Sequence, residues 1–146
     1  MNQVLWGSVL FSSLVGSASI LVSMYILLPA MGLPRLDFAA VTGGWIGVTG
    51  RYARVVGAGV FVAGGIAWGL LYALVWPWHS LLGGLAFSLI PFGISLMAIL
   101  PELNRFHILV YPVPGFLWLK LGGPQAVVAN LVQHLIFGLC LGRFYQ

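Results

Sequence analysis

Residues 55–78 read VVGAGVFVAGGIAWGLLYALVWPW and contain no charged side chain. The hydrocarbon core of a bilayer is about 30 Å thick, and roughly 20 apolar residues, each rising about 1.5 Å, cross it as a helix. Three other stretches long enough to do so are equally free of charge, at residues 4–30, 80–101 and 121–142. The sequence therefore predicts an all-α membrane protein with four transmembrane helices.

The composition excludes the class of soluble domains. Hydrophobic residues make up 61% of the chain, charged residues only 5%, and the mean hydropathy is +1.07. Four spans leave little of a 146-residue chain for an independently stable domain outside the membrane. We expect a single membrane domain over residues 1–146. The one cysteine, Cys140, lies in the last span, so no intrachain disulfide can form.

Basic residues predict the orientation, because Lys and Arg concentrate in cytoplasmic loops. Most of them fall in the first and third connections, which are therefore expected in the cytoplasm, with the N and C termini periplasmic or outside. These residues are Arg35, Arg51, Arg54, Arg105 and Lys120, against Arg143 alone at the other face. The net charge of +4 fits contacts with lipid headgroups, and we expect no nucleic-acid partner. The first apolar run follows no basic n-region and is too long for a signal peptide, so we expect it to remain as a helix.

The two long connections are predicted to differ. The first follows Gly32 and Pro34, which end one helix and delay the next, and Asp37 could cap a short interfacial helix within residues 37–50. The connection before the last span contains the apolar segment 106–119, which is broken by prolines. We expect that segment to be re-entrant or to lie on the membrane surface.

Two pairs of short motifs indicate an internal duplication. LPRLD at residues 33–37 is echoed by LPELN at residues 100–104, and WGL at residues 68–70 by FGL at residues 137–139. A true repeat implies two helical hairpins of the same orientation, related by a pseudo-two-fold axis along the membrane normal. Chance similarity is a rival explanation, because Leu, Gly and aromatic residues are abundant.

Small residues recur at four-residue spacing in three of the spans. In lipid, such residues let helix backbones approach closely. The candidate packing residues are Ser8, Ser12, Gly16, Gly65, Gly69, Asn130, Gly138 and Gly142, and Ala126 and His134 complete the series in the last span. They are expected to pack the bundle internally or to dock a neighbouring subunit, each on a different helix face.

His134 is the residue that invites a chemical hypothesis, because ionisable groups within a membrane are rare and often functional. Its imidazole could be an axial ligand of haem iron or chlorophyll magnesium, with Gly138 making room for the macrocycle one turn on. Alternatively it is a structural histidine, with Asn130 as a hydrogen-bond partner. A second haem ligand is not expected, because His79 is predicted at the outer edge and His107 in a cytoplasmic connection.

No catalytic constellation is recognisable. The two carboxylates, Asp37 and Glu102, fall at helix ends near Arg35 and Arg105 respectively. Metal-ligand spacings, nucleophile elbows and glycine-rich phosphate loops do not occur in the sequence. We therefore expect neither an enzyme nor a metal site.

Two motifs carry a resemblance to a known family. GLPRLD at residues 32–37 and HLIFGLCLG at residues 134–142 resemble a family of small four-helix bacterial membrane proteins of unknown function. The resemblance implies a multi-pass protein of the bacterial inner membrane and a shared role for His134. It supplies no reaction.

The function expected from these observations is that of a noncatalytic accessory subunit. Its partners would be lipids and the other integral membrane subunits of a larger complex, for example a respiratory or photosynthetic electron-transfer assembly. One alternative is a pigment- or haem-binding subunit that uses His134. The other is a small oligomeric transporter or channel.

Overall fold

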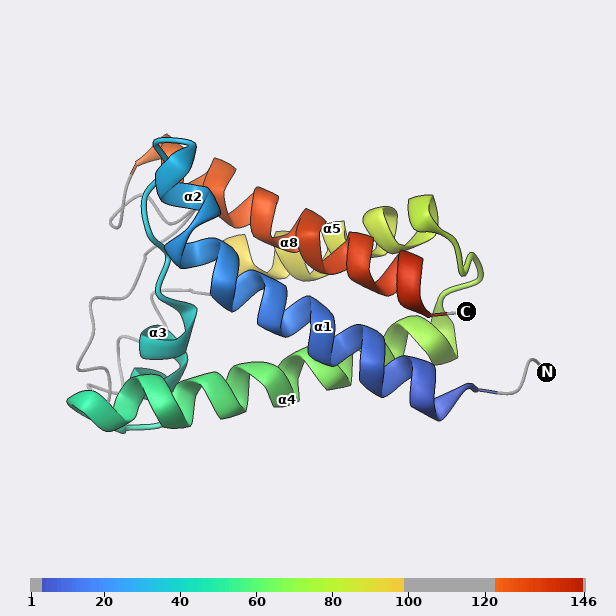
Figure 1. Cartoon of the computed structure of the whole chain (residues 1–146), viewed down its shortest axis with the longest axis horizontal. Coiled ribbons are helices and arrows are strands. Elements are labelled where there is room, and N and C mark those ends of the chain that lie inside the picture. Colours follow the sequence, from blue (N-terminus) through green and yellow to red (C-terminus); the bar gives the residue numbers. More distant parts are fainter. Residues whose placement is uncertain (1–3, 99–122, 146) are drawn as a thin grey trace.

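The computed structural model describes residues 4–98 and 123–145, and these residues are helical apart from their connections (Figure 1). Three helices are long and apolar enough to cross a membrane, and a fourth, α5, contains a shorter apolar stretch. The helices are α1 (Trp6–Tyr25), α2 (Leu27–Ala30), α3 (Phe38–Trp45), α4 (Arg51–Val75), α5 (Leu81–Ala98) and α8 (Pro124–Phe144). The predicted all-helical class is confirmed for the described residues, and the three long apolar helices are consistent with a membrane protein, whereas the fourth span remains a prediction. The apolar segment 106–119 lies outside the described residues.

Helix α1 is the centre of the arrangement, because it packs against both α4 and α8 (Figure 1). Helix α5 packs on α8, and α3 packs on the first half of α4. The predicted two-fold relation would make the α4–α5 pair equivalent to the α1–α8 pair. The structure departs from that symmetry, since α1 and α8 pack closely while α4 and α5 barely touch.

Helix α4 is displaced towards its N terminus from the charge-free stretch that predicted it. It begins at Arg51, because arginine can lie along an apolar helix and still keep its guanidinium in water. It ends at Val75, since a residue before proline is restricted to extended backbone. Trp76, which precedes Pro77, accordingly has φ −80° and ψ 126°.

The first charge-free stretch forms two helices where one was predicted. Pro29 has no N–H to donate to the carbonyl of Tyr25, and its ring crowds that carbonyl. Helix α1 therefore ends at Tyr25, and the chain resumes as the short α2. The last span starts at Pro124, a residue whose fixed φ suits a first helical turn, after Gly123 with φ +60°.

The capped helix predicted in the first connection is present as α3. The backbone N–H of Ala40 donates to Oδ1 of Asp37 at 2.9 Å. The other carboxylate oxygen of Asp37 accepts a hydrogen bond from Nε of Arg54 at 2.8 Å. The partner is thus Arg54 in α4 and not the neighbouring Arg35, whose guanidinium lies 5.7 Å from the ring centre of Tyr25. This ion pair ties the start of α3 to the first turn of α4.

Glycines mark the closest approaches between helices. A Cβ atom on Gly138 of α8 would lie 2.6 Å from the carbonyl oxygen of Gly84 in α5. A Cβ atom on Gly57 of α4 would overlap the carbonyl oxygen of Ala39 in α3. In a membrane, where lipid supplies no hydrophobic drive between helices, close backbone contact of this kind is a main source of helix association.

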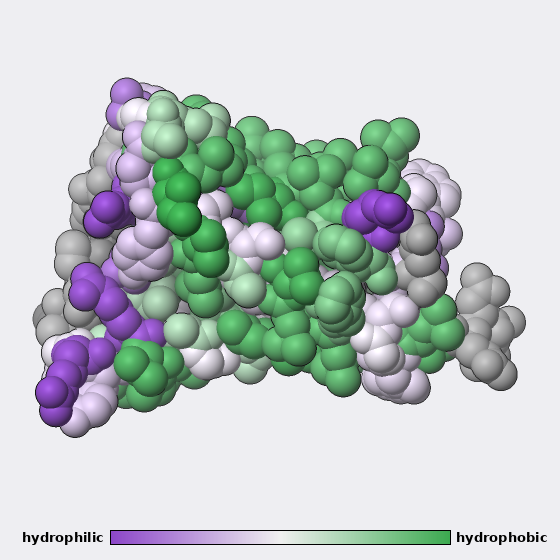
Figure 2. All heavy atoms as spheres, viewed as in Figure 1, coloured by the Kyte–Doolittle hydropathy of each residue, from purple (hydrophilic) through white to green (hydrophobic). Residues whose placement is uncertain are grey.

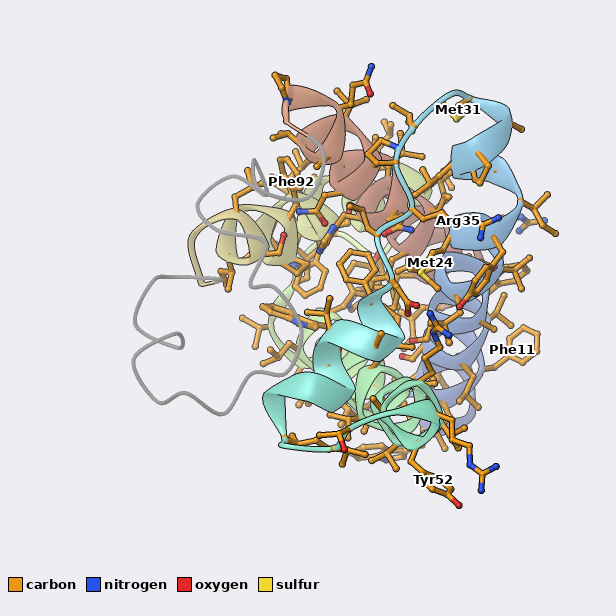
Figure 3. The ribbon with its side chains drawn as sticks, turned by 90° about the vertical axis from the view of Figure 1, so that its left-hand side faces the viewer. Phe11, Met24, Met31, Arg35, Tyr52 and Phe92 are labelled. Carbon is orange, nitrogen blue, oxygen red and sulfur yellow. The ribbon has the colours of Figure 1, made fainter. Side chains whose placement is uncertain are left out.

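Hydrophilic residues gather at the two ends of the molecule, and a broad apolar band separates them (Figure 2). Arg51 and Arg54 lie in the first turn of α4 at one end, and Arg143 lies in the last turn of α8 at the other. In Figure 3, Phe11 projects from the surface while Met24 lies inside the bundle, and their exposed fractions are 56% and 1%. The start of α1 and the end of α8 lie at the same end of the molecule (Figure 1).

A candidate binding pocket between α4 and α5

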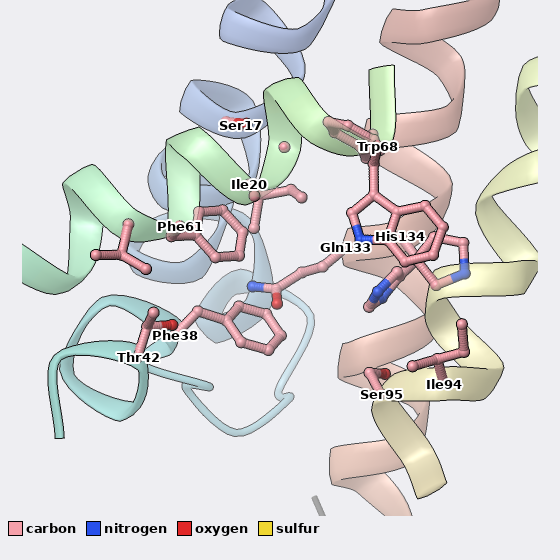
Figure 4. Close-up of a pocket in the computed structure, with 15 residues that line it drawn as sticks. Ser17, Ile20, Phe38, Thr42, Phe61, Trp68, Ile94, Ser95, Gln133 and His134 are labelled. Atoms are coloured by element: carbon pink, nitrogen blue, oxygen red, sulfur yellow. The ribbon is translucent and has the colours of Figure 1, made fainter. Parts of the chain in front are cut away.

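A pocket of about 370 Å³ lies between α4 and α5, which make few contacts with each other (Figure 4). Aromatic rings from three helices form much of its wall: Phe38 of α3, Phe61 and Trp68 of α4, and Phe137 of α8. The rings of Phe38 and Phe61 stack with centres 5.5 Å apart and planes 14° apart. The wall is therefore built from packed, flat apolar groups.

Five polar side chains also line the pocket. Ser17 comes from α1, Thr42 from α3, Ser95 from α5, and Gln133 and His134 from α8. The described lining residues include no Asp, Glu, Lys or Arg, so the pocket is polar in places but carries no fixed charge there.

Gln133 is the most unusual of these residues. Its side chain is fully buried, yet neither Oε1 nor Nε2 has a hydrogen-bond partner among the described residues. Figure 4 shows the amide group directed between Ile20 and Phe38. An unpaired buried polar group costs about 1–3 kcal/mol, so this amide is a strong candidate for contact with a ligand.

The His134 ring is held in one tautomer by the backbone. Its Nδ1 lies 2.9 Å from the carbonyl oxygen of Asn130. Because a carbonyl oxygen can only accept a hydrogen bond, Nδ1 carries the hydrogen, and Nε2 of a neutral ring is left as an acceptor. The ring of Phe92 meets the imidazole edge-on at 5.8 Å. His134 thus presents an oriented acceptor at the pocket wall.

Asn130 partners His134 through its main chain and helix α5 through its side chain. The Nδ2 atom donates to Oγ of Ser95 at 2.7 Å, which links α8 to α5. The Oδ1 atom is buried without a partner among the described residues. Asn130, Gln133 and His134 therefore place three polar groups within about one turn of α8.

The space beside Gly138, where we expected room for a macrocycle, is filled by α5. A Cβ atom on Gly138 would lie 2.6 Å from Oγ of Ser88 and 2.6 Å from the carbonyl oxygen of Gly84. Gly138 therefore serves the α5–α8 contact, and room for a porphyrin or chlorin ring must come from the pocket itself.

Most of the other predicted packing residues face a neighbouring helix. Gly16 packs against the ring of Phe137, and Gly142 packs against the start of α5. The hydroxyl groups of Ser17 and Ser13 lie against Gly65 and Gly69, respectively. Ser12 is buried, and its hydroxyl donates to the carbonyl of Val9 at 3.2 Å. Ser8, near the start of α1, is half-buried.

His79 does not line the pocket. His79 is in the turn between α4 and α5, where its Nε2 is 3.2 Å from the carbonyl oxygen of Tyr72, and its ring packs on Tyr145 at 4.8 Å. His107 and Glu102 fall outside the described residues. Within residues 4–98 and 123–145, no three His, Cys, Asp or Glu side chains come together as metal ligands.

His134 and Asn130 were predicted from the sequence, whereas Gln133, Ser17, Thr42 and Ser95 were not. A glutamine inside an apolar span is a usable signal, because an amide in lipid must find a partner. The serines and the threonine give no such signal, since a hydroxyl group in a helix can bond to the preceding turn, as that of Ser95 does to the carbonyl of Phe92 at 2.7 Å. The hydroxyl of Ser17, by contrast, is buried without a partner among the described residues.

Comparison with protein-family models, with curated proteins and with solved structures found no match to this chain.

Proposed function

We propose that this chain is a noncatalytic subunit of a larger membrane assembly, which docks its partner on the outer face of α4. The observation that carries the proposal is a row of small, exposed residues on that face, Gly59, Ala63 and Ala67, spaced four residues apart. A Cβ atom on Gly59 would meet no described atom within 4 Å. Small residues at this spacing are the usual contact surface for a second helix in lipid.

The inner face of α4 is already used by the chain's own helices. Gly57 packs against α3, and Gly65 and Gly69 pack against α1. Even so, only 17% of the apolar window of α4 is buried within the chain, against 44% for α1 and for α8. The helix with the most uncovered surface is thus the one that carries a second row of small residues.

The surrounding assembly belongs to the same proposal. We propose that α5 is a fourth span, that the chain resides in a bacterial inner membrane, and that the arginine-rich end of α4 faces the cytoplasm. Membership of the family of small four-helix bacterial membrane proteins remains a prediction from the two quoted motifs. A respiratory or photosynthetic electron-transfer complex is one assembly that would require such a subunit.

The test is gentle detergent extraction of the affinity-tagged chain from its native membrane, followed by a native gel and mass spectrometry of the band. We expect other integral membrane subunits to co-purify with the wild type. The double variant Ala63→Leu, Ala67→Leu should lose them, whereas Ala86→Leu, at an exposed position of α5, should retain them. A colourless, self-associated band without other subunits would reject the proposal and favour an oligomeric transporter or channel.

A pigment- or haem-binding subunit is the second candidate, favoured by the tautomer of His134. A histidine whose Nδ1–H is held by a backbone carbonyl presents Nε2 in the form that binds a metal. The prediction is visible absorbance in the purified band that is lost in His134→Leu and kept in His79→Leu. Absorbance that survives His134→Leu, or a colourless wild type, counts against it.

A further inference from the structure

We propose that the pocket between α4 and α5 binds a small, neutral, lipophilic molecule that carries a hydroxyl group, such as a phenol. This inference is independent of the docking proposal, because it concerns the inner side of α4 and not the row of small residues on its outer face. The walls, the polar groups and the entrance each limit what the ligand can be.

The walls require an apolar, uncharged ligand. The described lining residues are mainly aromatic and aliphatic and offer no charged side chain to balance an ion. Burying an unpaired charge is costly in such surroundings. A volume of about 370 Å³ is at the small end of the range of roughly 300–1,000 Å³ that ligand pockets occupy. A compact ring system with one polar group fits these limits.

The polar groups at the wall require a hydrogen-bond donor and an acceptor together. Gln133 offers the donor Nε2 and the acceptor Oε1, both unpartnered, and His134 adds the acceptor Nε2. A hydroxyl group both donates and accepts, so it can serve the amide donor and one of the two acceptors at once. A ketone, quinone or ether oxygen can only accept, and it would leave both acceptors unsatisfied.

A metal macrocycle satisfies this wall less well than a hydroxyl compound. Its metal would use Nε2 of His134 but would leave the amide of Gln133 without a partner. The space beside Gly138 is also taken by Ser88. The same histidine is therefore better used as a hydrogen-bond acceptor next to Gln133.

The rim of the pocket opens towards the part of the surface that we place in lipid. Val60 of α4 and Ile94 of α5 both line the pocket and are 39% and 46% exposed. They lie within the apolar spans of their helices and not at the charged ends. A ligand would therefore enter sideways from the bilayer, where a lipophilic molecule is already concentrated.

The experiment uses 2-naphthol as the probe and 2-methoxynaphthalene, which lacks the donor, as its match. Each is equilibrated by dialysis between micelles that contain the purified full-length chain and micelles without protein. We expect 2-naphthol to accumulate on the wild type at about one per chain, and to bind several-fold more tightly than 2-methoxynaphthalene. Leucine is close to glutamine in size. Gln133→Leu should therefore weaken the binding of 2-naphthol by about three- to tenfold and remove the preference for the hydroxyl compound.

A pair of glycine variants tests whether binding occurs in this pocket. Gly64 lines it, and a Cβ atom there would meet no described atom within 4 Å, so Gly64→Leu should fill the pocket and abolish binding. Gly7 in α1 is equally open but does not line the pocket, so Gly7→Leu should bind as the wild type does. Gln133→Met replaces Gln133→Leu if the latter does not elute as a single helical species.

Three results would overturn the proposal. The first is no excess of 2-naphthol over protein-free micelles. The second is equal binding of the two probes to the wild type, which would remove the role of the hydroxyl group. The third is unchanged binding to Gly64→Leu, which would place the ligand elsewhere. None of them bears on co-purification of partner subunits.

Discussion

Gly138 and Gly16 both sit at helix contacts, but what they face differs in its ability to move. A Cβ atom on Gly138 would meet the backbone of Gly84 and the side chain of Ser88, whereas one on Gly16 would lie 2.7 Å from the ring of Phe137. Gly138→Ala should therefore destabilise the fold more than Gly16→Ala, by about 1–2 kcal/mol. Both variants gain the same helix propensity, so the difference reports the backbone clash.

The measurement is the free energy of unfolding in mixed micelles, which is obtained by titration with SDS. Gly7→Ala is the control, because the added methyl group meets no described atom within 4 Å, and it should leave stability unchanged or slightly higher. Equal losses for Gly138→Ala and Gly16→Ala would show that α5 can shift away from α8 without cost.

The hydrogen bond between Asn130 and Ser95 should couple α8 to α5. Its length of 2.7 Å and the full burial of Asn130 indicate that this hydrogen bond contributes to the stability of the fold. Interhelical hydrogen bonds in membrane proteins average about 0.6 kcal/mol and reach about 1.7 kcal/mol. A double-mutant cycle of Asn130→Ala and Ser95→Ala, read by the same SDS titration, should return a coupling energy in this range. Strict additivity of the two variants would mean that the bond contributes nothing to stability.

At the scale of single residues, the sequence predicts which groups are small or polar but not what they face. The spans are apolar nearly all round, so they have no polar face to distinguish lipid from protein. Gly138 was predicted as a packing residue, yet its partner Gly84 was not. Gln133 was not predicted as a site residue, because only the gap between α4 and α5 makes its amide part of a pocket.

At the scale of elements, Asp37 is expected to hold α3 mainly as its N-cap. Loss of a capping side chain costs about 0.5–2 kcal/mol, while an exposed ion pair contributes about 0–1 kcal/mol. The guanidinium side of the pair is well exposed, at 63% for the Arg54 side chain. Asp37→Ala should therefore loosen α3, whereas Asp37→Asn, which keeps a capping oxygen, should remain close to the wild type.

Amide hydrogen exchange of the chain in nanodiscs, followed by mass spectrometry, measures this effect. Peptides that cover Phe38–Trp45 should exchange faster in Asp37→Ala, and those from the middle of α8 should not change. Equally fast exchange in Asp37→Asn would assign the stabilisation of α3 to the contact with Arg54 instead.

Helix positions followed from the absence of charge, and helix ends from proline and arginine. Each of the four charge-free stretches overlaps a helix within the described residues, because no other regular structure satisfies the backbone of a single segment in lipid. The ends moved where a local effect was stronger than hydropathy, as at Pro29, which divides the first stretch, and at Arg51, which extends α4. Helix α3 packs against α4 at Gly43 and Gly57. The spacing of glycines along the sequence does not predict this contact.

At the scale of the whole molecule, the duplicated motifs predicted a symmetric pair of hairpins. Such motifs record sequence similarity, whereas packing depends on the side chains between the helices. The crossing of α1 and α8 is closed by Gly16 against Phe137. At the α4–α5 side, Phe61, Trp68 and Ile94 line a pocket instead. The departure from symmetry is therefore also the origin of the candidate site.

The charge distribution predicts the orientation of the whole chain, and the single native cysteine makes that prediction measurable. Tyr52 is 58% exposed beside Arg51 at the start of α4, and Trp78 is 65% exposed in the turn beyond the other end of the same helix. In a Cys140→Ala background, Trp78→Cys should react with a membrane-impermeant maleimide on intact cells. Tyr52→Cys should react only after the membrane is opened, because we propose that the arginine-rich end faces the cytoplasm.

The Cys140→Ala chain without a new cysteine is the blank for this labelling. The reverse pattern, with Tyr52→Cys labelled from outside, would show that the basic residues do not set the orientation. Labelling of both variants from the same side would mean that α4 does not cross the membrane. That result would also reject the row Gly59, Ala63 and Ala67 as an intramembrane docking face, because the row depends on α4 being surrounded by lipid.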